Sequence, residues 1–191
     1  HWAASFRSMK YYSSLATAAV AFLMAQPMPI RAEQYPPAFV YETPQEFFAS
    51  GDFDRDGRTD LLIVDKESGK YRPGYQLTPG TFSWVDCRPS GIKDIAGFSI
   101  GCLLATNGEA AAFTSPDANQ ITLVDISSPT AASKPVNVPF TAALGPNTVV
   151  AVDIGGEGNT PLADLAVGSI YNSPDPSLGV LLRNDGAEFP K

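Results

Sequence analysis

A strand-turn-strand pattern that returns at a regular interval constrains this chain more than any other feature. Residues 60–65 form a short apolar run, which a turn containing Gly69 joins to a second run over residues 70–77. The same pattern begins again at Ala110 and at Asp164, with spacings of 50 and 54 residues. A recurring unit of about 52 residues built from short strands lies close to the size of known propeller-blade repeats.

These repeats predict an all-β fold. We expect β-propeller-type repeats in about three four-stranded blades, at residues 47–98, 99–146 and 147–191, after a lead-in segment at 33–46. Propellers close with about 4 to 8 blades, so three blades make an incomplete propeller with two open sheet edges. We therefore expect the sequence to be a piece of a longer reading frame, with an assembly of several copies as the other explanation. A β-sandwich that repeats its hairpins is the alternative fold.

The N-terminal residues have the order of a secretory signal peptide, which we place at residues 9–32. Lys10 gives a basic start, an apolar stretch of 11 residues follows at 15–25, and Ala32 is the small residue before the cut. A membrane anchor or a buried helix is the alternative, but spanning a bilayer needs roughly 20 apolar residues. Residues 1–8 precede the expected initiator and look like upstream translated sequence. We predict a secreted, extracellular or periplasmic protein with no membrane span after cleavage.

Cleavage leaves a strongly acidic chain. It removes three of the 13 Lys and Arg residues and none of the 20 Asp and Glu residues, so the net charge becomes −10. Nucleic acids and anionic lipids are bound by surplus Lys and Arg, so we expect neither as a partner. Divalent cations suit such a chain better.

Cysteine and histidine are scarce. The single His is residue 1, which excludes catalytic triads that need an internal His and zinc sites of the Cys/His type. In an exported chain, Cys87 and Cys102 are more typical of a disulfide than of catalysis. We predict that they pair and close a loop of about 15 residues, with two separate buried thiols as the alternative.

The most specific motif is an acidic loop at residues 51–61. Asp residues stand at loop positions 1, 3, 5 and 9, and Gly57 at position 6 allows a tight turn. If the backbone wraps around one point, the carboxylate oxygens converge there, and Ca²⁺ accepts 6 to 8 oxygens at about 2.3 to 2.6 Å. Without an ion these carboxylates repel one another. Mg²⁺ fits less well because it prefers an octahedron that keeps several waters. The predicted calcium ligands are the side chains of Asp52, Asp54, Asp56 and Asp60 and the backbone carbonyl of Arg58.

This acidic loop is not an EF-hand. An EF-hand needs a bidentate Glu at loop position 12, where this chain has Ile63 within a β-like run. A solvated turn without an ion is the remaining alternative, because Asp and Gly are ordinary turn formers.

Three segments of the chain share features with one known family. They are Asp52-x-Asp54-x-Asp56-Gly57-x-x-Asp60-Leu61, residues 164–168 and residues 179–189. Together they resemble the FG-GAP and VCBS repeats, whose blades form propellers like that of integrin α chains, over roughly residues 47–189. In that family the loop binds Ca²⁺ between adjacent strands of a blade, which implies the same role for this loop.

The other two repeats depart from the family pattern. In the third repeat Gly155 stands where the second carboxylate belongs, so we expect a weak or absent site. Its only candidate ligands are Asp153, Glu157 and Asp164. In the middle repeat, residues 107–109 (Asn-Gly-Glu) offer no acid cluster, and we predict no metal there.

No motif in the sequence indicates a catalytic site, and we predict that the chain is not an enzyme. No spacing singles out the two carboxyl groups that a glycosidase needs. Motifs for a serine nucleophile or for phosphate binding are missing from the sequence. Aromatic residues could stack on sugars, although packing in a blade is their more usual role, and these are Tyr71, Tyr75, Phe82 and Trp84.

The sequence therefore predicts a secreted or cell-surface calcium-binding module. We expect it to act in protein, matrix or glycan recognition, with calcium in a structural role and a protein or carbohydrate as the partner. The alternative is the noncatalytic propeller portion of an exported polysaccharide-active enzyme.

Overall fold

The computed structural model describes residues 38–106, 108–131, 133–140, 145–154, 162–169 and 179–184. Contacts divide the chain into two compact units, His1–Gln34 and Tyr35–Lys191, and every described residue belongs to the second. The predicted signal peptide at 9–32 lies outside the described residues. Within the described ranges, no helix is long and apolar enough to cross a membrane.

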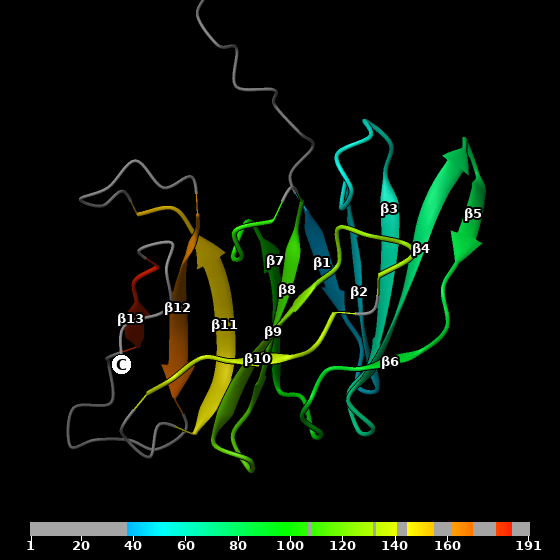
Figure 1. The fold of residues 1–191 in the computed structure, drawn as a ribbon. Helices are drawn as coiled ribbons and strands as arrows, with labels where there is room; N and C mark the ends of the chain where they lie inside the picture. Colours follow the sequence, from blue (N-terminus) through cyan, green and yellow to red (C-terminus); the bar gives the residue numbers. More distant parts are fainter. Residues whose placement is uncertain are drawn as a thin grey trace, which may run out of the picture. The chain divides into compact units, whose positions relative to one another are not determined.

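The described chain is all-β and forms three antiparallel sheets, none of them closed (Figure 1). The first sheet has the order β1-β2-β3-β4-β5 with β6 also paired to β4, and its strands are β1 (Phe39–Glu42), β2 (Glu46–Gly51), β3 (Asp60–Asp65), β4 (Lys70–Thr78), β5 (Thr81–Trp84) and β6 (Arg88–Pro89). The second sheet has the order β10-β9-β8-β7, and its strands are β7 (Gly97–Gly101), β8 (Ala110–Ser115), β9 (Gln120–Asp125) and β10 (Val136–Asn137). The third sheet has the order β11-β12-β13, and its strands are β11 (Pro146–Val152), β12 (Asp164–Ser169) and β13 (Val180–Leu182).

The repeat is visible in the strand register. Asp60, Ala110 and Asp164 each begin the second strand of the hairpin that β2–β3, β7–β8 or β11–β12 forms. The turns that follow in the first two sheets also match, because Gly69 and Asn119 have positive φ values of 66° and 49°. Gly and Asn adopt such backbone more readily than other residues. The first two sheets therefore share one register at a spacing of 50 residues.

The strand numbers differ from three four-stranded blades. The first sheet has six strands, because β1, in the predicted lead-in, pairs with β2, and β6 adds to β4. The second sheet has four, and the third has three within the described ranges. The predicted boundaries after residues 98 and 146 fall inside β7 and β11. These strands begin with Gly97 and Pro146, residue types that are depleted in strands.

Two apolar cores lie on opposite faces of the second sheet. One joins it to the first sheet, where the Phe47 and Phe98 rings lie 5.5 Å apart between centroids. The other joins it to the third sheet through residues such as Ala112, Val149 and Leu165. All six residues of β8 are buried. Successive strand side chains point to opposite faces, so this burial means that the second sheet is covered on both.

The aromatic residues considered for sugar stacking divide between core and surface. Tyr71 and Tyr75 are buried in the core between the first two sheets. Tyr75 also donates its hydroxyl to the backbone carbonyl of Ile126 at 2.7 Å. Trp84 is exposed, with the Arg72 guanidinium 5.5 Å from its ring centroid.

The predicted disulfide between Cys87 and Cys102 is wrong, because both thiols are free. Cys102 follows β7, and its sulfur accepts a hydrogen bond from Arg55 of the acidic loop at 3.3 Å. Cys87 precedes β6, which pairs with the start of β4 at the end of the first sheet away from that loop. Cys87 is exposed and Cys102 half-buried, so the alternative of two buried thiols is wrong as well.

Candidate metal centre

The acidic loop joins β2 and β3 of the first sheet. β2 ends at Gly51 and β3 begins at Asp60, and these two residues pair directly. Between them the chain coils, with φ values of 60° at Arg55 and 85° at Gly57. The fully buried Phe53 side chain anchors the loop in the core. Gly57 thus stands where the backbone needs a left-handed residue, a conformation that Gly adopts without steric cost.

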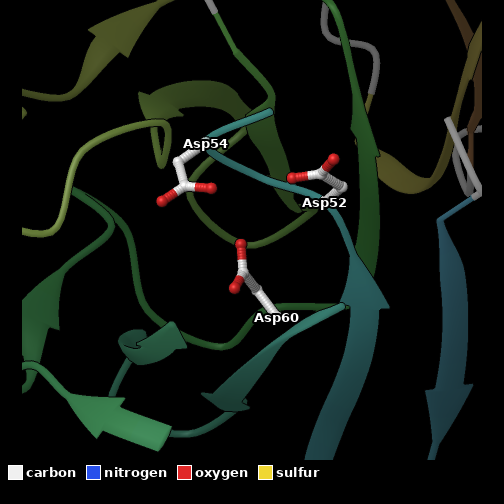
Figure 2. Close-up of side chains that lie close together, drawn as sticks. All are labelled: Asp52, Asp54 and Asp60. Carbon is white, nitrogen blue, oxygen red and sulfur yellow. The ribbon is translucent and has the colours of Figure 1, made fainter. Parts of the chain in front are cut away.

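Three of the predicted ligands come together in this loop. Asp52, Asp54 and Asp60 each place one carboxylate oxygen within 4.8 Å of the others (Figure 2). Asp52 and Asp60 are buried, and Asp54 is half-buried. No second cluster of this kind occurs in the part of the chain that the structure describes. These three oxygens could hold a divalent cation.

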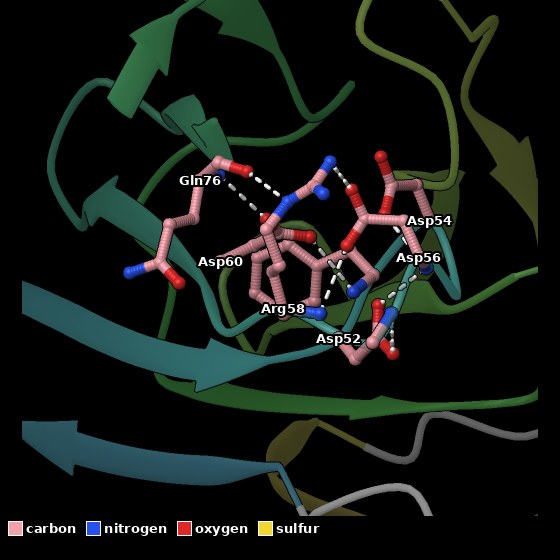
Figure 3. Close-up of polar contacts among 8 residues, drawn as sticks. Asp52, Asp54, Asp56, Arg58, Asp60 and Gln76 are labelled. Carbon is pink, nitrogen blue, oxygen red and sulfur yellow. Dashed lines mark hydrogen bonds and ion pairs between the residues drawn. The ribbon is translucent and has the colours of Figure 1, made fainter. Parts of the chain in front are cut away.

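Backbone amides orient the two buried carboxylates. Asp60 accepts a hydrogen bond from the amide of Phe53 at 3.0 Å and from the amide of Gln76 in β4 at 2.9 Å. Asp52 accepts hydrogen bonds from the amides of Asp56 at 3.0 Å and Gly57 at 2.9 Å (Figure 3). The hydrogen bonds to Asp60 favour its ionised form. The fold of the loop therefore holds both carboxyl groups in place.

Asp56 and Arg58 form a separate pair nearer the surface. The Arg58 guanidinium forms an ion pair with Asp56, and its Nε donates to the backbone carbonyl of Gln76 at 2.6 Å (Figure 3). The Arg58 amide also donates to Asp56 at 2.9 Å. Asp56 thus lies outside the cluster of three carboxylates. Calcium ligation by Asp56 and by the Arg58 carbonyl stays a prediction.

Burial makes two of the clustered carboxyl groups hard to ionise. It raises the pKa of Asp60 to about 6, although hydrogen bonds from Gln76 and Phe53 act in the opposite direction. The pKa of Asp54 is also raised, first by burial and then by the charge of Asp56. A cation among these carboxylates opposes both shifts because it stabilises the ionised forms.

A residue of the second repeat also reaches the loop. Glu109, directly before β8, donates its amide to the carbonyl of Phe53 at 3.0 Å. Burial raises the pKa of its carboxyl group, while Arg55 lowers that pKa and Asp52 raises it. No signal in the sequence indicates this neighbour, because only the packing of the second sheet on the first brings Glu109 beside the loop.

The three repeats differ at the connections β2–β3, β7–β8 and β11–β12, which we call their corners. By strand register, the counterparts of Asp52 and Asp60 are Cys102 and Ala110 in the second repeat and Asp153 and Asp164 in the third. Asp164 is buried and Asp153 is exposed. Asn107 and Glu157 lie outside the described residues. The absence of metal from the middle repeat and the weak third site stay predictions.

A separate hollow of about 380 Å³ lies at the other end of the first sheet. Its lining includes Ile63 and the charged residues Glu46, Asp65, Lys70 and Arg72. None of its lining residues belongs to the acidic loop, so the hollow is distinct from the carboxylate cluster.

No protein-family model, curated protein or solved structure matches this chain. The resemblance to FG-GAP and VCBS repeats therefore rests on the residues of the sequence and stays a prediction.

Proposed function

We propose that this chain is a secreted or cell-surface calcium-binding β-repeat module that recognises a protein, matrix or carbohydrate partner. Calcium has a structural role in this proposal. The observation that carries it is the cluster of Asp52, Asp54 and Asp60, whose oxygens lie within 4.8 Å of one another.

The chemistry and dimensions of the cluster fit calcium. Carboxylate oxygens are ligands that Ca²⁺ prefers, at about 2.3 to 2.6 Å, so two oxygens on one ion lie at most about 5 Å apart. The 4.8 Å limit within the cluster satisfies this condition. Mg²⁺ fits less well, because it prefers an octahedron that keeps several waters and usually uses only one or two carboxylates.

Calcium in this loop would stabilise the junction between the first two sheets. Phe53 links the loop to both sheets, because its side chain packs in their common core and its carbonyl accepts the Glu109 amide. An ion that binds only the folded loop adds its binding free energy to the stability of these contacts. The loops at this end of the sheets would then be held in one arrangement for a partner.

Features of the sequence support the rest of the proposal. The signal peptide expected at 9–32 favours export, and the likeness to FG-GAP and VCBS repeats favours propeller blades and a role in recognition. The net charge of −10 after cleavage disfavours nucleic acids and anionic lipids. The alternative, a noncatalytic portion of an exported polysaccharide-active enzyme, shares the calcium site but requires a polysaccharide partner.

Thermal unfolding with calcium and with chelator tests the calcium part of the proposal. Saturation at 100 times the dissociation constant stabilises a folded protein by about 2.7 kcal/mol. We expect calcium to raise the melting temperature of the native chain and to leave that of Asp54→Ala unchanged. An equal rise in both proteins would contradict the assignment of the site.

Binding assays on immobilised matrix proteins and polysaccharides test the recognition part. The proposal predicts binding that requires calcium and that Asp54→Ala weakens. Calcium-dependent binding confined to polysaccharides would favour the enzyme-associated alternative. No binding to either kind of surface, in a sample that binds calcium, would contradict a role in recognition.

A further inference from the structure

The outer face of the first sheet carries exposed apolar side chains across β1, β2 and β3. Tyr41, Phe48 and Ile63 are aligned across these strands. The exposed Arg72 continues this row in β4, and Trp84 in β5 lies on the same face. The exposed fraction is 69% for Tyr41 and 40% for Trp84. Large contiguous apolar patches on soluble proteins mark interaction sites.

The outer face of the third sheet is also apolar. Val150, Ala166 and Leu181 are aligned across β11, β12 and β13. The exposed fraction is 57% for Val150 and 39% for Leu181. The inward-facing Val149 and Leu165 lie in the core shared with the second sheet.

The exposed face of the first sheet has a buried counterpart in the second. Phe48 pairs with Ile63 in the first sheet, and the residues 50 positions later, Phe98 and Phe113, pair in the second. Both phenylalanines are buried against the first sheet. At these two positions the exposed face of the first sheet therefore resembles a face on which another sheet packs, whereas Arg72 stands where the second sheet has the buried Thr122.

The exposed face of the third sheet has a buried counterpart as well. In the second sheet, Ser99, Ala112 and Leu123 are aligned in the same way across β7, β8 and β9. Ala112 and Leu123 are buried against the third sheet, and Ser99 Oγ accepts the amide of Ala151 at 2.9 Å. The outer face of the third sheet thus corresponds to a face that already carries a neighbouring sheet.

We propose that a second copy of this chain packs on these two faces, with the third sheet of each copy on the first sheet of the other. The two faces correspond to the two sides of one kind of interface, which the structure contains twice, between the first and second sheets and between the second and third. Each copy offers one face of each kind, so two copies cover all four faces and close the arrangement. Pairing between like faces would require two kinds of interface that do not occur among the described residues.

This dimer continues the sheet-to-sheet contacts of the fold and does not involve the acidic loop. It therefore goes beyond the proposed function. The purified chain should dimerise with calcium and with chelator, so failure of the calcium site and failure of the dimer are separate results.

Sedimentation of the purified chain over a range of concentrations, with and without chelator, measures the dimer. We expect twice the chain mass for the native protein. Ile63→Asp and Val150→Asp each place a charge in the interface, so each should weaken association by more than about 30-fold. Val136→Asp, at an exposed apolar residue in β10, is the matched control and should remain dimeric.

Mixing the two variants distinguishes head-to-tail pairing from pairing of like faces. Ile63→Asp keeps an intact third-sheet face and Val150→Asp keeps an intact first-sheet face, so the mixture should form a heterodimer through one interface. Circular dichroism checks that both variants fold. Tyr41→Asp, at a more exposed residue of the first-sheet face, replaces Ile63→Asp if the latter does not fold.

Several results would overturn the proposal. They are a monomeric native chain, an assembly larger than two copies, a dimer that survives either folded variant, and a mixture of variants that stays monomeric. A dimer that resists Val150→Asp but not Ile63→Asp would indicate pairing of the first sheets instead.

Discussion

The corners of the first and third sheets both have an aspartate at the equivalent position, but the residues around that aspartate differ. Asp60 and Asp164 each begin the second strand of a hairpin and accept a backbone amide from the neighbouring segment, at 2.9 and 2.8 Å. Asp52 beside the first is 3% exposed, whereas its counterpart Asp153 lies at the surface. An aspartate at this position thus closes the hairpin, and a cation site needs a second buried carboxylate as well.

The corner of the second sheet has neither carboxylate. Cys102 and Ala110 stand in their places, and the carbonyl of Glu109 accepts the amide of Ile126 at 3.1 Å. A corner of this kind can therefore close on backbone hydrogen bonds. The first corner therefore does not need three carboxylates in order to close. Their presence is better explained by a bound cation.

Removing the shared aspartate should have the largest effect on stability. Asp60→Ala leaves the buried amide of Phe53 and the half-buried amide of Gln76 without this acceptor, at about 1 to 3 kcal/mol each. We expect the free energy of unfolding in chelator to fall by about 2 to 4 kcal/mol. Asp164→Ala removes one acceptor and should cost about 1 to 2 kcal/mol, and urea denaturation measures both losses.

Asp60→Asn provides the control for this comparison. The amide keeps one acceptor oxygen but has no charge, so it should restore part of the stability without restoring calcium binding. An Asp60→Ala chain that is as stable as the native chain in chelator would show that this corner does not depend on the aspartate.

Asp54→Ala should separate metal binding from stability. Asp54 is half-buried, and its carboxylate accepts the amide of Asp56 at 3.2 Å. We expect stability in chelator to change by no more than about 0.5 kcal/mol. Calcium affinity should fall more than about tenfold, because even outer-shell partners of a metal contribute 10 to 100-fold. A large loss of stability in chelator with unchanged calcium affinity would mean that Asp54 is only structural.

The pH dependence of stability in chelator should also reveal the first corner. The pKa of Asp60 is about 6 in the folded chain and near 3.8 in the unfolded chain. Between these values the folded chain holds a proton that the unfolded chain has released, so raising the pH favours unfolding. The contribution of Asp60 is therefore fully present below about pH 4 and is lost as the pH rises through about 6. The raised pKa of Asp54 acts in the same direction.

The difference between the native chain and Asp60→Asn isolates this effect from the other carboxyl groups. Urea midpoints at about pH 4 and about pH 7 should show a larger loss with pH in the native chain, and calcium should reduce that loss. A native chain that gains stability relative to Asp60→Asn as the pH rises in chelator would contradict the raised pKa.

Asp153→Ala should have the smallest effect. Asp153 lies at the surface of the third corner, away from the described carboxylate cluster. We expect unchanged calcium stoichiometry and a change in unfolding free energy within about 0.5 kcal/mol. Calorimetry and urea denaturation measure these quantities, and a lost equivalent of calcium would assign a working site to the third repeat.

The sequence was sufficient for features that depend on local spacing. The turn at Gly57 brings Asp52, Asp54 and Asp60 together within one short loop, so their proximity could be predicted from their positions. The repeated hairpins could be predicted for the same reason, because the two strands of each hairpin are neighbours in the chain.

Features that depend on packing or on competing partners could not be predicted in this way. Glu109 reaches the acidic loop only because the second sheet packs on the first. Cys87 and Cys102 are near in sequence but lie toward opposite ends of the sheets. Asp56 has the same loop spacing as the other acids, yet its nearest opposite charge is Arg58, with which it pairs.

Calorimetric titration of the purified chain with calcium tests most directly the claim that the first corner, and not the third, holds a cation. We expect one tight equivalent of calcium for the native chain and for Asp153→Ala, and affinity lower by more than about tenfold for Asp54→Ala. Absence of binding by a folded native chain, or unchanged affinity in Asp54→Ala, would show that this corner holds no cation.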